Sequence, residues 1–370
     1  MAFANIFRDK RVLLTGHTGF KGSWLAEWLL LLGARVTGYS LPPPTSPALF
    51  EQLGHATRLD HVIGDVRDLA ALRDVVDRVK PDFVFHLAAQ SLVRLSYSLP
   101  VETYSANVMG TVNVLEAVRL AGRRCVVVVV TTDKCYENRE WVHSYREEDP
   151  MGGHDPYSSS KGAAELVVSA YRQSYFSHSD SLVRLASARA GNVIGGGDWA
   201  LDRIVPDCIR SLARGDVVPV RNKIATRPWQ HVLEPLSGYL WLGALLANPT
   251  LIPGRIPTVF QGAYNFGPPP DSNRTVADLV TEVLKHWPGE WRDQSDPKAV
   301  HEATLLNLST DKAFHFLKWK PVWSFAETIA QTVSWYRKVN TTTGNAVIET
   351  PSQIASYVDA ARDDGVVWAL

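Results

Sequence analysis

Strand and helix signals alternate over the first 130 residues, and this rhythm restricts the possible folds more than any other feature. Short apolar runs lie at 11–15, 34–39, 61–65, 83–89 and 126–130, separated by segments with helical spacing. Such alternation favours a parallel sheet with helices on both faces. Strands that are buried on both faces are continuously apolar, as the five consecutive valines at 126–130 are. We therefore expect an α/β fold, a doubly wound parallel sheet.

Composition and charge exclude several classes of protein. The chain has 38 Lys and Arg against 38 Asp and Glu, so no net charge favours nucleic acid or an anionic membrane as a partner. Apolar runs such as 28–32 are far too short to span a membrane. Three cysteines, Cys125, Cys135 and Cys208, show no metal-ligand spacing. We expect a reduced, cytoplasmic protein that holds no metal.

A glycine-rich segment, GHTGFKG at 16–22, joins the first predicted strand to the first predicted helix. Its glycines, Gly16, Gly19 and Gly22, permit a turn that lets the backbone approach a pyrophosphate and directs a helix N-terminus at it. Phe20 and Lys21 lie within the same turn. It is not a phosphate loop of the Walker A type, because the lysine is followed by Gly22. The context predicts a Rossmann dinucleotide site, and a purely structural turn is the alternative.

The second predicted strand should end in an acidic residue if the cofactor is NAD. Ser40 stands there instead, and no arginine for a 2′-phosphate stands beside it, so this strand does not decide between NAD and NADP. Beyond residue 192 glycine and proline increase and the rhythm breaks. We expect a Rossmann domain over 1–190, to which later segments return, and a smaller irregular α/β substrate-binding lobe mainly over 191–350. Residues 351–370 are expected to form a C-terminal tail.

The sequence YSSSK, 157–161, opens a predicted helix. Tyr157 and Lys161 are four residues apart and share a helix face. A phenol, with a pKa near ~10, is a poor base at neutral pH unless a nearby ammonium favours the phenolate. The pair therefore predicts a base for a hydroxyl proton, with an ordinary surface turn as the alternative.

Thr132, Asp133 and Lys134 follow the valine strand directly. They are either solvated charges at a strand end or groups of an active site. Ligands of doubly wound sheets bind at the carboxyl ends of the strands, so the position favours an active site.

Six segments together carry a family resemblance: GHTGFKGSWL, LAAQSLVRLSY, TTDKCYEN, YSSSK, RAGNVIGGGDW and RPWQHVLEPL, which span most of residues 11–235. They resemble the nucleotide-sugar 4,6-dehydratases of the extended short-chain dehydrogenase/reductase family, which also have the GxxGxxG spacing. The Asp-Lys pair, where the wider group has Asp-Glu, is similar to the CDP-glucose branch. The resemblance implies bound NAD and CDP-glucose as the substrate. We also expect a homo-oligomer, a dimer or a tetramer.

The resemblance implies roles for the strand end and the helix. Tyr157 takes the 4-OH proton while hydride leaves C4 for NAD, Thr132 binds the 4-oxygen, and Lys161 also binds cofactor ribose. Asp133 donates a proton to the leaving 6-OH. Lys134 is either the base that removes the C5 proton or a cation that stabilises the C4 enolate.

Further positions follow from the same motifs. The cofactor contacts implied are Gly16, Gly19, Phe20, Lys21, Gly22, Ser40, Asp65, Val66, Leu87, Ala88, Ala89, Asn107, Tyr157 and Lys161. The substrate contacts implied are Gln90, Arg94, Asn192, Arg203 and Arg227. Arginine suits a pyrophosphate, because its planar fork matches phosphate geometry. A surface ion pair is the alternative for each arginine.

Three rival functions differ in what they need. A nucleotide-sugar 4-epimerase needs Tyr157 and Lys161 but no acid–base pair for C5 and C6. An NAD-binding sensor needs no tuned phenolate. A metal-dependent lyase needs ligand spacing that the histidines do not show. The strand-end pair Asp133 and Lys134 favours the dehydratase.

Overall fold

The computed structural model describes residues 2–178, 180–201, 203–295, 305–340 and 345–370. Its centre is a seven-stranded sheet in the order β3-β2-β1-β4-β5-β6-β11, with every pair of neighbours parallel. The strands are β1 (Arg11–Thr15), β2 (Arg35–Ser40), β3 (Asp60–Ile63), β4 (Phe83–His86), β5 (Cys125–Val130), β6 (Val183–Ala190) and β11 (Ala263–Phe266). The doubly wound parallel sheet expected from the sequence is confirmed.

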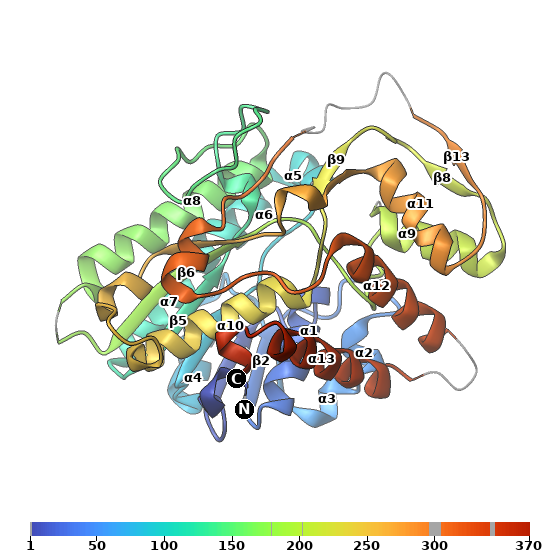
Figure 1. Ribbon diagram of the computed structural model, residues 1–370. Helices are drawn as coiled ribbons and strands as arrows, with labels where there is room; N and C mark the ends of the chain where they lie inside the picture. Colours follow the sequence, from blue (N-terminus) through green and yellow to red (C-terminus); the bar gives the residue numbers. More distant parts are fainter. Residues whose placement is uncertain (1, 179, 202, 296–304, 341–344) are drawn as a thin grey trace.

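Helices cover both faces of this sheet (Figure 1). Val127 and Val129 of β5 pack with α4 (Leu69–Val79), α7 (Gly110–Ala121) and α8 (Pro156–Tyr171). The alternate valines of the same strand face the cluster that contains α1 (Phe20–Leu31) and α10 (Leu233–Ala247). Successive side chains of a strand point to opposite faces, so a strand covered twice has to be apolar throughout.

The order in which the chain adds strands to the sheet changes direction between β1 and β4. From β1 the chain winds outward to β2 and β3, then returns to β4 on the other side of β1. The carboxyl ends of these two neighbouring strands flank the crevice at which doubly wound sheets bind their ligands. The glycine loop follows β1, and the segment 87–89 follows β4.

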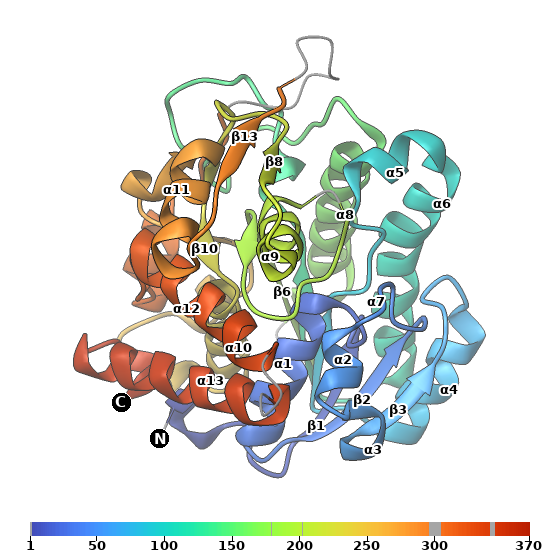
Figure 2. The same cartoon turned by 90° about the vertical axis from the view of Figure 1, so that its right-hand side faces the viewer.

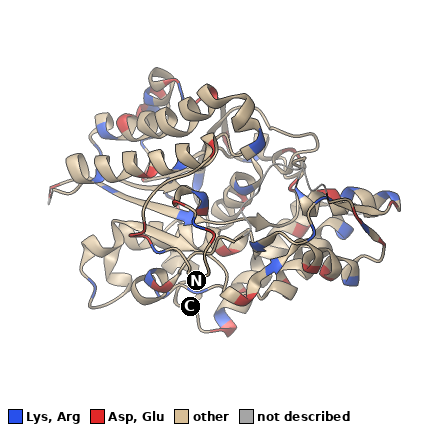
Figure 3. Ribbon diagram, turned by 90° about the horizontal axis from the view of Figure 1, so that it is seen from above, with Lys and Arg blue, Asp and Glu red and all other residues tan. Residues whose placement is uncertain are grey.

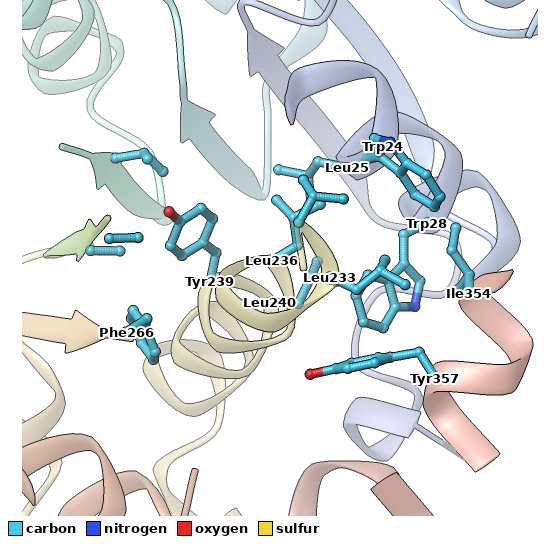
Figure 4. Packing of buried hydrophobic residues seen from close by; sticks show 14 of the residues in the cluster. Trp24, Leu25, Trp28, Leu233, Leu236, Tyr239, Leu240, Phe266, Ile354 and Tyr357 are labelled. Atoms are coloured by element: carbon cyan, nitrogen blue, oxygen red, sulfur yellow. The ribbon is translucent and has the colours of Figure 1, made fainter. Parts of the chain in front are cut away.

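The last elements of the chain pack against its first ones. Helix α13 (Ala346–Asp363) lies on α1, where the rings of Trp28 and Tyr357 meet edge to face at 5.9 Å (Figure 4). Phe3, in the 3-10 helix η1 (Ala2–Asn5), stacks on Trp368 of η9 (Val367–Ala369) with ring centroids 4.9 Å apart. Both marked ends of the chain therefore lie together (Figure 1). The segment 351–370, expected to be a tail, contributes several side chains to the buried core, among them Tyr357 and Trp368.

A smaller lobe stands beside the carboxyl ends of the strands (Figure 2). It is built from short paired strands and two amphipathic helices. Its elements are α9 (Ile204–Arg214), β8 (Val218–Val220), β9 (Thr226–Pro228), β12 (Asn273–Thr275), α11 (Val276–His286) and β13 (Trp291–Asp293). Strand β9 pairs with β12 and β8 pairs with β13. The division into domains at 190 and 350 stays a prediction, although β11 and α10 return to the main sheet.

The remaining elements are short, except for α12. They are α2 (Leu49–Gln52), α3 (His55–Arg58), α5 (Val93–Ser98), α6 (Pro100–Tyr104), η2 (Ser105–Met109), η3 (Asp133–Cys135), η4 (Arg172–Phe176), β7 (Val193–Ile194), β10 (Gln230–His231), η5 (Pro249–Leu251), η6 (Pro257–Phe260), η7 (Pro270–Ser272), η8 (Ala313–Leu317) and α12 (Phe325–Val339). Basic and acidic residues are interspersed along the ribbon (Figure 3). Among the helices that the structure describes, none has the length and apolar character needed to cross a membrane.

Candidate active site

The glycine loop is pressed against the end of β4. Gly16 has φ +78°, and a Cβ atom there would stand 2.7 Å from the backbone nitrogen of Ala88. A Cβ atom on Gly22 would stand 2.1 Å from the carbonyl oxygen of Gly16. Both positions therefore need glycine, the first for its left-handed backbone and both for space.

The N-terminus of α1 is open on the side of the loop. Gly19 is its N-cap and offers no side chain to the first amides, and a Cβ atom on Gly19 would meet only the Gly16 carbonyl, at 3.5 Å. The amides of the first turn, which includes Phe20 and Lys21, have no partner within the helix. This arrangement fits a pyrophosphate, which helix N-termini bind through such amides.

Lys21 turns from this loop toward the centre of the molecule. Its ammonium donates to the hydroxyl of Tyr239 at 3.4 Å. Burial lowers the pKa of Lys21 to about 8, while the carboxylate of Asp133 opposes that fall. The lysine thus lies between the cofactor loop and the strand end that carries the acid.

The end of β2 presents hydroxyls where an acid is common. The hydroxyl oxygens of Thr18 and Ser40 are 2.8 Å apart, and Thr18 donates to the carbonyl of Leu41. After β3, the guanidinium of Arg67 binds Asp65 and lowers the pKa of that carboxyl. Ser40 and Asp65 therefore border the same end of the sheet as the glycine loop.

Asn107 holds the loop after β4 to helix α8. Its side chain accepts from the Gln90 amide at 2.9 Å and donates to the Gln90 carbonyl at 3.0 Å and to the Ser160 hydroxyl at 2.8 Å. It lies in the π-turn η2, a wider turn between α6 and α7. The Gln90 side chain bonds Leu92 and Thr103, so it stabilises its own loop, and Arg94 is exposed on α5.

Three polar side chains meet at the end of β5. The Thr132 hydroxyl donates to a carboxylate oxygen of Asp133 at 2.9 Å. The same threonine is hydrogen-bonded to the side chain of Tyr157. Thr132, Asp133 and Tyr157 are 7%, 3% and 8% exposed, so they form one buried cluster rather than a solvated strand end.

Burial decides the protonation of this cluster. It raises the pKa of Asp133, against the opposing effects of Lys134, Thr132 and Arg227, which favours the neutral acid. Burial also raises the pKa of Tyr157 to about 12, although the hydrogen bond with Thr132 and the charge of Arg203 lower it. The lowering expected from YSSSK alone does not appear, because desolvation outweighs the nearby positive charge.

Lys161 lies one helical turn after Tyr157. Its ammonium is 3.5 Å from the Val130 carbonyl at the end of β5, and its side chain is buried. Burial lowers the pKa of Lys161 to about 8, and the charge of Glu165 opposes that fall.

The second lobe brings two arginines to the cluster. Arg203, at the N-cap of α9, forms a 2.7 Å ion pair with Asp198, and its charge acts on Tyr157 and Lys21. Arg227 of β9 lowers the pKa of Asp133 by its charge. Asn192 follows β6 and is half-buried. These three residues, expected at the substrate, therefore border the site.

Two residues at the site were not predicted. Tyr239 projects from α10 on the side opposite Leu233 (Figure 4), and burial, with smaller effects of Tyr157 and Asp133, raises the pKa of its phenol. Gly191 leaves room for the acid, because a Cβ atom there would stand 2.8 Å from Asp133 Oδ2. Neither has a local sequence signal, since each is defined by a contact between distant segments.

The part of the chain that the structure describes contains no set of side chains arranged to bind a metal ion. No group of three His, Cys, Asp or Glu side chains could hold an ion there. The three cysteines are free and buried, and burial raises the pKa of each thiol. They are therefore neutral thiols at ordinary pH.

The glycine loop at the switch point of the sheet, the Tyr157–Lys161 helix and the polar end of β5 define an extended short-chain dehydrogenase/reductase. The family model for GDP-mannose 4,6 dehydratase matches residues 13–242, and the chain belongs to that family. A CDP-glucose 4,6-dehydratase of Salmonella typhimurium is 49% identical over 338 residues, 90% of this chain and 92% of that protein.

Solved structures show the same architecture. DesIV, a dTDP-glucose 4,6-dehydratase from Streptomyces venezuelae with NAD and TYD bound, aligns with a TM-score of 0.71 and 26% identity. The alignment covers 88% of this chain and 97% of DesIV. The epimerase Mth375 from Methanothermobacter thermautotrophicus aligns with a TM-score of 0.72 over 91% of this chain and 95% of its own, and at 24% identity it shows the fold alone.

Proposed function

We propose that the protein is an NAD-dependent CDP-glucose 4,6-dehydratase, a hydro-lyase that produces CDP-4-dehydro-6-deoxy-glucose. The observation that carries the proposal is the buried acid Asp133, hydrogen-bonded to Thr132 beside Tyr157. The 49% identity to the Salmonella typhimurium enzyme supports the CDP-glucose substrate. The proposed cofactor is NAD, as in DesIV.

Oxidation at C4 comes first in this proposal. Tyr157 removes the 4-OH proton and Thr132 donates a hydrogen bond to the 4-oxygen. The charge of Arg203, and in this proposal that of Lys161, favours the phenolate that this step needs, against the burial that raises the pKa of Tyr157. NAD, when bound, accepts the hydride from C4 and later returns it to C6. The C4 ketone makes the C5 hydrogen acidic.

Elimination then breaks the C5–H and C6–O bonds. Asp133, whose pKa is raised by burial, donates to the departing 6-OH, which leaves as water. Lys134 either accepts the C5 proton as a neutral amine or, as an ammonium, stabilises the C4 enolate while Asp133 or a water molecule moves the protons. Return of hydride to C6 and of a proton to C5 completes the cycle without net oxidation.

The remaining assignments are part of the same proposal. The cofactor is bound by the glycine loop with Phe20 and Lys21, by Ser40, Asp65 and Val66 near its adenosine, by 87–89, and by Tyr157 and Lys161, with Asn107 as a support. The substrate is bound by Asn192, Arg203 and Arg227, with Gln90 and Arg94 at the edge of the site. A cytoplasmic location and a homo-oligomer stay predictions.

Incubation of the purified protein with CDP-glucose and NAD tests the proposal. The expected product is a 4-keto-6-deoxy sugar, detected by mass spectrometry and by absorbance in alkali, with no net NADH at 340 nm. Accumulation of NADH, or a C4 epimer as the product, would contradict it. The epimerase alternative shares Tyr157 and Lys161, but it needs no acid at C6.

A comparison of nucleotides separates the substrate assignment from the reaction class. CDP-, UDP-, GDP- and dTDP-glucose are compared by kcat/KM under identical conditions. We expect CDP-glucose to be preferred. A preference for another nucleotide would leave the dehydratase class standing and overturn the CDP assignment.

A further inference from the structure

A buried carboxylate lies directly behind Lys161 and has no part in the proposed reaction. Glu165 follows Lys161 by four residues in α8, so the two side chains share a helix face. Glu165 is 5% exposed and accepts three hydrogen bonds. The donors are the Thr131 hydroxyl, the Ser187 hydroxyl at 2.8 Å and the Arg189 guanidinium at 2.8 Å. One carboxylate thus joins α8 to the ends of β5 and β6.

The partner guanidinium extends this connection to the turn that carries the acid. Arg189 donates to the Tyr136 hydroxyl at 2.8 Å and to the Glu147 carbonyl at 3.0 Å. The Tyr136 hydroxyl donates in turn to Asn265 of β11 at 2.7 Å. Tyr136 directly follows η3, which begins at Asp133. Glu165 and Arg189 therefore fix both sides of the reacting cluster.

The carboxylate is ionised although it is buried. Burial opposes its ionisation, but the charge of Arg189 and the donors at 131, 187 and 189 together lower the pKa of Glu165 below its ordinary value. A fixed negative charge one helical turn from an ammonium favours the ammonium. The pKa of Lys161 is lowered to about 8 by burial, and Glu165 is the largest effect that opposes this fall.

The other titratable groups that act on Lys161 cannot replace Glu165. Cys135 of η3 is a neutral thiol, because burial raises its pKa far above the ordinary value. His86 of β4 has a pKa of about 3 through burial and is neutral at working pH. Lys21 of α1 is a like charge. Among the described residues whose charge acts on Lys161, Glu165 is the one ionised anion.

We propose that Glu165 is a positioning residue. Its single carboxylate both keeps Lys161 positively charged and holds the end of β5 from which Thr132 projects. Through Thr131 it fixes the backbone from which Thr132 projects, and by its charge it keeps the lysine able to bind an anionic or polar oxygen. Its part in turnover rests on the proposed dehydratase function. Its control of the lysine charge does not.

The test compares Glu165→Gln with Ser187→Ala in the full chain. Glu165→Gln replaces the carboxylate by a neutral amide, so it removes the charge. Ser187→Ala removes one hydrogen bond to the carboxylate and leaves its charge in place. The titration of Lys161 is followed through its ¹³Cε chemical shift, assigned with Lys161→Arg, in protein without added substrate. We expect the midpoint to fall by about one pH unit or more in Glu165→Gln and to stay within about 0.3 units of the parent in Ser187→Ala.

Turnover of the nucleotide sugar gives the second readout. In Glu165→Gln the alkaline limb of the kcat profile should move to lower pH with the lysine midpoint, whereas Glu165→Asp, which keeps the charge, should restore it. A merely structural role would reduce kcat by the same factor at every pH. An unchanged Lys161 midpoint in folded Glu165→Gln, or an equal shift in Ser187→Ala, would overturn the proposal.

Two further outcomes are separable. If Glu165→Gln does not fold, as judged by circular dichroism, the double variant Glu165→Gln/Arg189→Met removes both buried charges. A fall of the Lys161 midpoint is still required of it, smaller than in Glu165→Gln because a neighbouring positive charge is lost as well. If the midpoint falls as expected but the parent protein turns over no nucleotide sugar, the coupling stands and the proposed function fails.

Discussion

Replacement of Glu234 by glutamine should change how the stability of the protein depends on pH. Glu234 lies in the first turn of α10, fully buried, and accepts hydrogen bonds from the Tyr357 hydroxyl at 2.6 Å and from the amides of Trp323 and Val322 at 2.7 and 3.0 Å. It therefore connects α10, which carries Tyr239 into the site, to α13. Despite these donors, burial raises the pKa of Glu234 from 4.5 to about 7.

The sign and size of the effect follow from that shift. A raised folded-state pKa stabilises the fold below the unfolded pKa, and this contribution is lost as pH rises through the folded pKa. A shift from 4.5 to about 7, at 1.36 kcal/mol per unit, corresponds to about 3 kcal/mol. Glutamine does not titrate. The free energy of unfolding of Glu234→Gln, relative to the parent, should therefore rise by about 3 kcal/mol between pH 4.5 and 8.

Urea unfolding at pH 4.5, 5.5, 6.5 and 8, followed by tryptophan fluorescence, measures this difference. Loss of one acceptor in the variant should add a constant cost of about 1–3 kcal/mol at every pH, which does not affect the slope. Tyr357→Phe is the matched control, because it keeps the carboxyl and removes one donor, and it should keep the parent's slope or steepen it. A difference that is flat with pH, or that falls as pH rises, would refute the reasoning.

Three further predictions concern the site. Tyr157→Phe should lower kcat about 10²–10⁴-fold while NAD binding, measured by fluorescence titration, is retained; unchanged kcat would exclude the base role. Gly22→Ala should destabilise the loop and abolish NAD binding, because its Cβ would stand 2.1 Å from the Gly16 carbonyl oxygen, whereas Gly19→Ala should keep the melting temperature and only weaken binding; equal effects would contradict this. Lys134→Glu should retain product formation from CDP-glucose if residue 134 is the C5 base, and loss of activity in the folded variant would support the cationic stabiliser.

The elements with local signals were predictable from the sequence. Each expected strand of the main sheet starts within two residues of the observed one. For β1, β4 and β5 the reason is burial on both faces, which leaves a continuous apolar run. Asp68 is a residue type that commonly caps helices, and its carboxylate accepts from the Ala71 amide at the start of α4 at 3.0 Å. The first helix starts at Phe20, directly after its cap Gly19 in the glycine-rich segment.

What depends on distant contacts was not predictable. The hydrogen bond between Lys21 and Tyr239 connects residues 218 positions apart in the sequence. Gly191 leaves space for the Asp133 carboxyl because the end of β6 lies beside η3. The protonation of Tyr157 was expected from a charge four residues away, but it follows from burial by several elements. Local spacing identifies which groups react, whereas desolvation by the whole fold sets their charge.

The packing of α13 on α1 has a consequence for synthesis of the chain. The apolar face of α1, with Trp28, is synthesised well before Tyr357 and Trp368, which cover it. The nascent Rossmann half therefore exposes tryptophan until those residues have been synthesised, a state in which chains recruit chaperones or aggregate. Premature termination shortly before residue 346 should yield a product that retains the proposed catalytic residues yet is degraded, because the cofactor helix lacks its cover.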